Sequence, residues 1–131
     1  MVWKASAAMR SALDAVLAER QRQDAKWGEQ NHPMTPRGQN RSVSPEHFAC
    51  EVLGVPTARE ARESCDNAHR RGDGTYAHIL VEEVAEFVEA CVLHGDASDE
   101  ARAEMVQVAA VALAMLECID RKRAKMGEVA K

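Results

Sequence analysis

The stretch "ILVEEVAEFVEACVL", residues 79–93, has the periodicity of an amphipathic helix and indicates the fold class of the chain. At 100° per residue, its apolar side chains gather on one face and most of its glutamates on the opposite face. The apolar face consists of Leu80, Val84, Phe87, Val88 and Cys91, and the acidic face of Glu82, Glu86 and Glu89. Residues 72–101 contain eight acidic residues and no lysine or arginine, so a cation from elsewhere must compensate this helix.

The composition of the whole chain favours one all-α domain over residues 1–131. Of these 131 residues, 46% are hydrophobic and only 4% are aromatic, which is typical of helices rather than sheets. The net charge of −4 argues against bulk electrostatic binding to a nucleic acid polymer or to an anionic membrane. No apolar run reaches the ~18 residues that a membrane span needs. The four cysteines form no C-x-x-C pair, so we expect reduced thiols and a cytoplasmic protein.

Four helices are predicted, joined by one long insertion. Periodicity and end signals place the helices at 6–26, 57–71, 75–94 and 98–123. The second begins with Thr57 as a plausible N-cap and Glu60 at the capping-box position. Residues 28–56 contain all four prolines and are predicted to be mostly loop, with a short helical turn over 45–54. The predicted fold is a helical bundle of about four helices with a long loop insertion.

The last helix contains the run "MVQVAAVALAML", residues 105–116, which is apolar on every side except at Gln107. Such a helix is predicted to be a central one, buried among other helices. Glu104 and Gln107 are three residues apart and therefore share a face. A six-residue turn makes this helix the antiparallel neighbour of the acidic helix. We therefore expect Glu83 and Glu86 to meet Glu104 and Gln107.

Three carboxylates in one half-buried site must protonate, separate or bind a metal ion. Oxygen ligands of this kind suit Mg²⁺ or Mn²⁺, which would keep open positions for water and substrate phosphates. Two other interpretations stay open on the residues alone. The acidic face can be solvated, or its carboxylates can pair with arginines of residues 57–71 or of another subunit.

Two motifs on consecutive helices resemble those of a known family. "EEVAE" (82–86), followed by "EMVQ" (104–107), looks like the EExxE…ExxD signature of the MazG-like all-α nucleoside triphosphate pyrophosphohydrolases. The stretches "RQRQDAKWGEQNHP" (20–33) and "GTYAHILVEEVAEFVEA" (74–90) are similar to small phage and actinobacterial members. The resemblance covers both ends of the chain and omits most of residues 34–56.

This resemblance implies a Mg²⁺-dependent enzyme that cleaves the α–β phosphoanhydride of an NTP or dNTP, giving a nucleoside monophosphate and pyrophosphate. By matching positions, it implies Glu83, Glu86 and Glu104 as metal ligands, and Glu82 as a residue that supports them or holds water. Gln107 departs from the pattern, which has Asp there. Gln107 can still coordinate through its carbonyl oxygen, but it removes a negative charge. That departure leaves room for a relative that binds nucleotide without hydrolysing it.

A substrate-binding group is expected near the end of the first helix. Gln23 and Trp27 are one helical turn apart, with Lys26 beside them. Trp27 can stack on a base and Lys26 can meet a phosphate, although Trp27 can equally pack the end of its helix. The resemblance places this segment near the active site and implies a homodimer or homotetramer whose sites use more than one subunit. A purely structural helical oligomer with a solvated acidic face is the remaining alternative.

Overall fold

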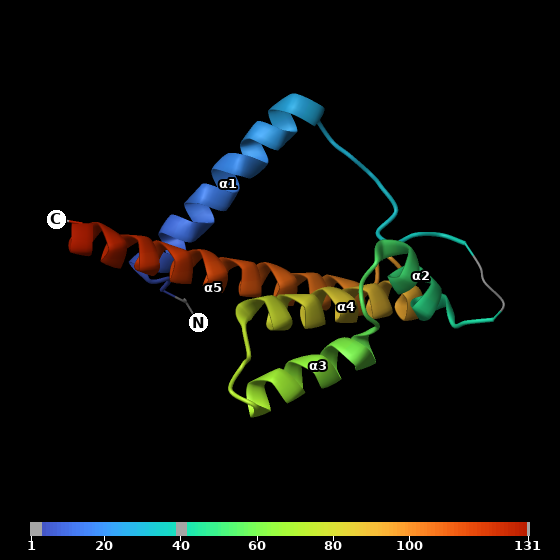
Figure 1. The fold of residues 1–131 in the computed structure, drawn as a ribbon. Coiled ribbons are helices and arrows are strands. Elements are labelled where there is room, and N and C mark those ends of the chain that lie inside the picture. The colour runs from blue at the N-terminus through green and yellow to red at the C-terminus, as the bar shows by residue number, and fades with distance from the viewer. Residues whose placement is uncertain (1–3, 39–41, 131) are drawn as a thin grey trace. The chain divides into compact units, whose positions relative to one another are not determined.

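The computed structural model describes residues 4–38 and 42–130, which form five α-helices and no strand (Figure 1). The all-α prediction is therefore confirmed for these residues. The helices are α1 (Ala7–Trp27), α2 (Pro45–Leu53), α3 (Ala58–Arg70), α4 (Tyr76–His94) and α5 (Asp99–Ala130). The expectation of about four helices was one too low, because the predicted helical turn in the insertion is the nine-residue helix α2. None of the described helices is long and apolar enough to cross a bilayer.

Side-chain caps determine where most of these helices begin. Ser6 and Ser44 each accept a hydrogen bond from the backbone N–H three residues later, at the starts of α1 and α2. The predicted capping box at α3 is present: Thr57 Oγ1 accepts from the Glu60 N–H, and the Glu60 carboxylate accepts from the Thr57 N–H. These caps satisfy N–H groups that have no partner inside a helix, so they fix the helix boundaries.

The insertion is tied to α3 by Glu46, a residue of α2. Its Oε1 accepts a hydrogen bond from the backbone N–H of Ala58 at 3.1 Å, at the first residue of α3. The short link between α2 and α3 also turns at Gly54, which has a φ of 73° that side chains rarely adopt. The start of α3 is therefore held from α2 as well as by its own capping box.

The described residues divide into two compact units. One unit is His32–Val111, and the other consists of the described residues of Met1–Asn31 and Ala112–Lys131. α2, α3 and α4 belong to the first unit, α1 belongs to the second, and α5 contributes residues to both. Whether residues 1–131 act as one domain stays a prediction.

The core of the first unit is built on α4 and consists mainly of small side chains. Three buried clusters join α4 to its neighbours on α2, α3 and α5 (Figure 1). They are Ala49, Cys50 and Val88, then Ala58, Ala61 and Ala85, then Ala90, Cys91 and Ala101. Because alanine has the smallest side chain with a Cβ, the backbones of α3 and α4 can approach closely along the second cluster. This close approach determines which long side chains of α3 reach α4.

The expectation that residues 105–116 form a buried central helix is wrong for the single chain. None of these residues is buried, and the side chains of Met105 and Val106 are 41% and 53% exposed. The physical reason is that, within the unit His32–Val111, the buried contact of α5 is with α4, which covers one side of it. Among the residues of α5 whose burial is described, Ala101 is the buried one, and it packs against Ala90 and Cys91 of α4.

Candidate metal centre

Three carboxylates from two helices converge in the first unit of the chain. Glu83 and Glu86 lie three residues apart on α4, and therefore on one side of that helix. Glu104 lies on α5, beyond the turn that returns the chain against α4. One carboxylate oxygen from each residue lies within 4.8 Å of the other two. The structure thus brings together three of the four residues for which the sequence predicted a metal site.

Two oxygens of this cluster lack any partner. The Oε2 atoms of Glu83 and Glu104 are inaccessible to solvent and accept no hydrogen bond in the described structure. Burial, together with the neighbouring carboxylates, raises the pKa of both side chains above the ordinary value. A buried polar atom without a partner is unfavourable, and each such atom in a folded protein requires an explanation. The cluster therefore needs a proton or a cation to complete it.

The third carboxylate of the cluster has a cation beside it. Arg62 of α3 donates from Nη2 to Oε1 of Glu86 at 3.3 Å, and the Glu86 side chain is only 19% exposed. This ion pair is the arginine alternative that the sequence left open, and it accounts for part of the charge on α4. The buried Oε2 atoms of Glu83 and Glu104 still lack a partner, because the ion pair of Arg62 is with Glu86.

The donor set and its spacing suit a hard divalent cation. Mg²⁺ binds oxygen at about 2.1 Å, so two of its ligands lie at most about 4.2 Å apart. The three carboxylate oxygens, at up to 4.8 Å, would need only small side-chain rotations to reach that spacing. Mn²⁺ takes the same kinds of oxygen ligand. The unpartnered oxygens of Glu83 and Glu104 are the observation on this site that best fits a cation ligand set.

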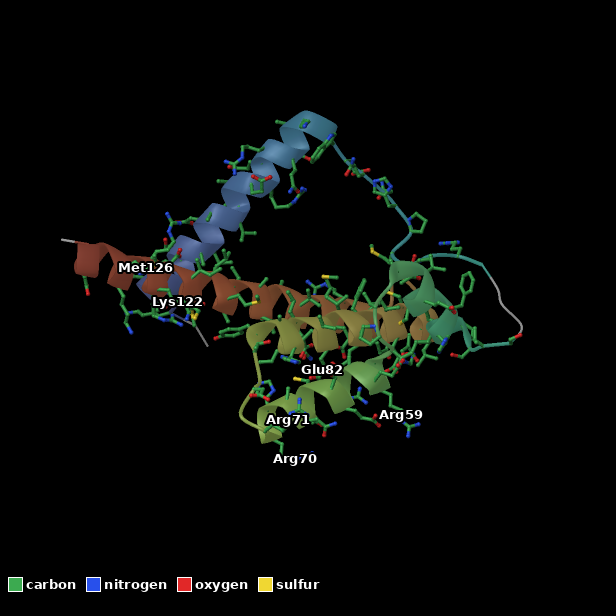
Figure 2. All side chains as sticks on the ribbon, viewed as in Figure 1. Arg59, Arg70, Arg71, Glu82, Lys122 and Met126 are labelled. Atoms are coloured by element: carbon green, nitrogen blue, oxygen red, sulfur yellow. The ribbon has the colours of Figure 1, made fainter. Side chains whose placement is uncertain are left out.

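Two further predicted residues lie near this cluster without joining it. Gln107 is one turn beyond Glu104 on α5 and is exposed. Glu82 lies on the side of α4 that faces α3 (Figure 2), and its carboxylate is beside the thiol of Cys65. Burial and this carboxylate raise the pKa of the Cys65 thiol to about 11. Whether either residue supports a metal ion stays a prediction.

The predicted substrate group, Gln23, Lys26 and Trp27, belongs to the other unit of the chain. The Nζ atom of Lys26 lies 4.8 Å from the centre of the Trp27 ring, a cation–π contact, and the Trp27 side chain is 55% exposed. The Gln23 side chain hydrogen-bonds Arg20 and Glu19 on the same helix. An indole that is this exposed does little to pack the end of its helix. A role of Gln23, Lys26 and Trp27 in substrate binding stays a prediction.

Sequence reasoning left open that arginines of residues 57–71 pair with the carboxylates, but it did not single out Arg62 among them. The signal that could have identified it is the buried stripe of α3, which consists of Ala58, Ala61, Cys65 and Ala68. Arg62 borders this stripe on the helical wheel, whereas Arg59 and Arg70 lie on the opposite side. Figure 2 shows Arg59 and Arg70 on the outer side of α3, away from α4.

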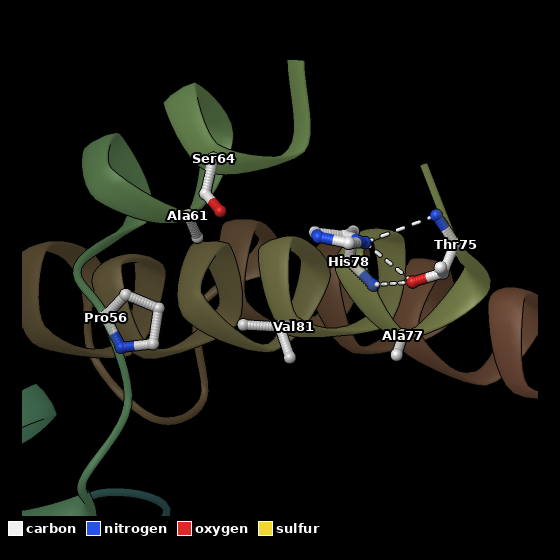
Figure 3. Close-up of a pocket in the computed structure, with 7 residues that line it drawn as sticks. All are labelled: Pro56, Ala61, Ser64, Thr75, Ala77, His78 and Val81. Carbon is white, nitrogen blue, oxygen red and sulfur yellow. Dashed lines mark hydrogen bonds between the residues drawn. The ribbon is translucent and has the colours of Figure 1, made fainter. Parts of the chain in front are cut away.

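A cavity of about 210 Å³ lies between α3 and α4 (Figure 3). Its lining consists of Pro56, Ala61, Ser64, Thr75, Ala77, His78 and Val81. His78 is occupied in capping α4, because its Nδ1 accepts from the backbone N–H of Thr75 at 3.2 Å. No acidic side chain lines this cavity, so it is separate from the carboxylate cluster.

Comparisons with known proteins assign no family to this chain. No family model, no protein with a curated description and no solved structure matches it. The resemblance to the MazG-like enzymes therefore depends on the motifs quoted above alone.

Proposed function

We propose that this chain is a Mg²⁺-dependent nucleoside triphosphate pyrophosphohydrolase that releases a nucleoside monophosphate and pyrophosphate. The observation that carries the proposal is the convergence of Glu83, Glu86 and Glu104, with two buried oxygens that lack a partner. The motifs that supply these residues are those that resemble the MazG-like family. Four free cysteine thiols agree with the cytoplasmic location that we propose.

In this proposal the three carboxylates hold Mg²⁺, and Mn²⁺ can replace it. The ion, when bound, neutralises phosphate charge and lowers the pKa of a bound water. Glu83, Glu86 and Glu104 fix the position of the reacting phosphates, and Glu82 supports the arrangement from the α3 side. Gln23, Lys26 and Trp27 are proposed separately as substrate-binding residues, because an indole can stack on a base and an ammonium can meet a phosphate. No protein nucleophile is required, because phosphoryl transfer depends mainly on positioning and charge neutralisation.

We also propose that the chain works as a homodimer or homotetramer. The support is the large amount of apolar side-chain surface that a single chain leaves open on α1 and α5. On α1, Met9, Leu13, Val16 and Leu17 share one face and are each 41–57% exposed. On α5, Met105, Val106, Ile119 and Met126 are exposed as well. A second copy of the chain would bury such faces.

A second candidate function is nucleotide binding without turnover. Gln107 favours it, because an amide in place of a carboxylate removes one negative charge from the end of the predicted ligand set. In that case the protein would bind Mg²⁺ and nucleotide but release no product, and Gln107→Asp would restore hydrolysis.

Product analysis tests the proposal. The wild-type chain is incubated with a panel of NTPs and dNTPs, with Mg²⁺ or with EDTA, and the products are separated by chromatography. We expect pyrophosphate and monophosphate with Mg²⁺ only. We expect Glu86→Gln to reduce turnover by about 10²-fold or more, the usual cost of losing one group that positions developing charge. Glu51→Gln, an exposed change on α2, is the matched control. Release of orthophosphate and diphosphate instead would contradict the proposal.

A further inference from the structure

Arg62 differs from the other arginines of its helix in what it contacts. The others pair locally: Arg59 with Glu63, Arg70 with Asn67, and Arg71, just past the end of α3, with Asp73. Arg62 instead crosses to α4 and pairs with Glu86, a member of the carboxylate cluster. Its guanidinium is also close enough to Glu82 and Glu89 of α4 to be stabilised by their charges.

The packing of α3 on α4 explains this reach. Ala58, Ala61 and Ala85 are at most 3% exposed and form the contact between the two helices. Arg62 directly follows Ala61, and Glu86 directly follows Ala85. Their side chains therefore both start at the edge of this alanine contact, where they form the ion pair. The Arg62 side chain remains 49% exposed, so it lies at the solvent-exposed edge of the cluster.

We propose that Arg62 is a substrate-binding residue: Glu86 holds it beside the cluster until Glu86 binds the metal ion, after which its guanidinium binds a phosphate oxygen of the substrate. This inference depends on the proposed function, because it needs both a metal ion and a phosphate at the cluster. It adds a binding residue from α3, a helix that carries neither of the two acidic motifs.

The chemistry of Glu86 and of Arg62 supports this exchange of partners, in which Arg62 leaves Glu86 and binds a phosphate. The Oε1 atom of Glu86 contacts Arg62, and an ion placed among the three carboxylates would draw on the same carboxylate and repel the guanidinium. Arg62 would then lack its partner while remaining at the solvent-exposed edge of the cluster. A planar guanidinium donates two parallel hydrogen bonds to phosphate oxygens, and arginine stays charged at any working pH. A triphosphate therefore offers Arg62 better acceptors than the single contact that it has with Glu86.

The exchange has a consequence for binding. Without substrate, Arg62 competes with the metal ion for Glu86, so it weakens metal binding. With a triphosphate present, Arg62 strengthens the binding of that triphosphate. The two ligands are then coupled through one side chain, and the coupling must be reciprocal.

The test measures metal and triphosphate binding separately, with Arg62→Gln and with Arg59→Gln as the matched control on the outer side of α3. Free Mn²⁺ is followed by electron paramagnetic resonance with the protein alone, and binding of inorganic triphosphate at saturating Mn²⁺ is followed by calorimetry. We expect R62Q to bind Mn²⁺ alone at least threefold more tightly than wild type, and to bind triphosphate at least tenfold more weakly. We expect R59Q to match wild type in both measurements. Arg62→Lys, which keeps the charge without the two parallel donors, should bind Mn²⁺ like wild type and triphosphate with intermediate affinity.

Three results would overturn the inference. R62Q that behaves like R59Q in either measurement shows that Arg62 does not exchange partners, while the metal site itself stands. R62Q that binds Mn²⁺ more weakly shows that Arg62 supports the ligands and does not compete with the ion. An absence of Mn²⁺ binding in wild type and every variant overturns the metal site, and this role of Arg62 fails with it.

Discussion

At the scale of single residues, the carboxylate cluster is costly to the fold, and this cost is informative. Glu83 and Glu104 each hold a buried oxygen without a partner, next to other negative charges. A structural role does not require such an arrangement, because an apolar or neutral side chain of similar size would pack there without the charge. Strained polar clusters of this kind are typical of functional sites, where stability is lower than the sequence could otherwise provide.

The raised pKa values of Glu83 and Glu104 predict how stability depends on pH in the absence of metal. Both pKa values lie above their ordinary value of 4.5 in the folded chain, so the folded state holds more protons than the unfolded state just above pH 4.5. Their stabilising contribution is therefore complete below pH 4.5 and is lost as the pH rises through the raised pKa values. In EDTA, we expect the Glu83→Gln protein to lose less folding stability than wild type as the pH rises. It should therefore be more stable than wild type at pH 7.

Urea unfolding at several pH values between 4.5 and 8, with fluorescence detection, measures this effect. Asp14→Asn, a change of an exposed acid on α1, is the control and should follow the wild-type profile. Added Mg²⁺ should stabilise wild type at pH 7 more than it stabilises Glu83→Gln. Equal pH profiles for wild type and Glu83→Gln would show that Glu83 carries no electrostatic cost.

The acidic residues of the cluster could be predicted from the sequence, whereas their cation could not. Glu83, Glu86 and Glu104 follow from helical periodicity and from one short turn, both of which are local properties of the chain. The contact of Arg62 depends on how α3 rotates against α4, and this rotation is set by the packing of Ala58 and Ala61 against the distant Ala85. Tertiary packing decides such contacts, and a charge pattern alone does not report them.

At the scale of elements, the contact between α3 and α4 controls the geometry around Glu86. Ala85 is fully buried against Ala58 and Ala61, so any larger side chain there would push the helices apart. We predict that Ala85→Leu destabilises the fold by about 1–3 kcal/mol, the usual cost of overpacking. It should also weaken the contact between Arg62 and Glu86, because the two side chains stand on opposite sides of this seam.

Thermal and urea unfolding of Ala85→Leu check this prediction. Ala77→Leu, the same change at an exposed position of α4, is the matched control and should alter stability by less than about 0.5 kcal/mol. A wild-type melting temperature for Ala85→Leu would show that the seam is loose enough to accept a leucine.

Most helix boundaries were predictable in the same local way, and so was the helical turn over 45–54 in the insertion, whereas the continuation of the last helix to Ala130, beyond the predicted end at residue 123, was not. The starts of α3 and α4 follow from N-cap residues that can be read directly in the sequence, Thr57 and Thr75. Residues 28–56 offered mainly proline and polar residues. There, the helix α2 is stabilised by Ala49 and Cys50, which pack against Val88 of α4, a contact between distant segments.

At the scale of the whole molecule, the exposed apolar faces of α1 and α5 are surfaces that a second copy of the chain could bury. The all-α class followed from composition. What buries residues 105–116 could not be predicted, because a helix that is apolar on every side needs neighbours that can come from the same chain or from another copy. We predict that Leu13→Glu reduces the assembly state of the protein, since a charge in the middle of the α1 face would be costly to bury between copies.

Sedimentation velocity over a range of protein concentrations tests this prediction. Wild type should sediment as a dimer or tetramer, and Leu13→Glu as a smaller species. Ser11→Glu adds the same charge on the opposite side of α1, so it should leave the wild-type assembly intact. A monomeric wild type, or equal effects of the two substitutions, would contradict a role of this face in assembly.

The hydrogen bond from Ala58 to Glu46 has a consequence for protein engineering. Because α2 supplies this acceptor, the chain between Trp27 and Ser44 can be shortened or lengthened without disturbing the start of α3. A deletion that continues through Glu46 removes the acceptor and loosens the first turn of α3. Loop grafts intended to change the properties of this protein should therefore end before Ser44.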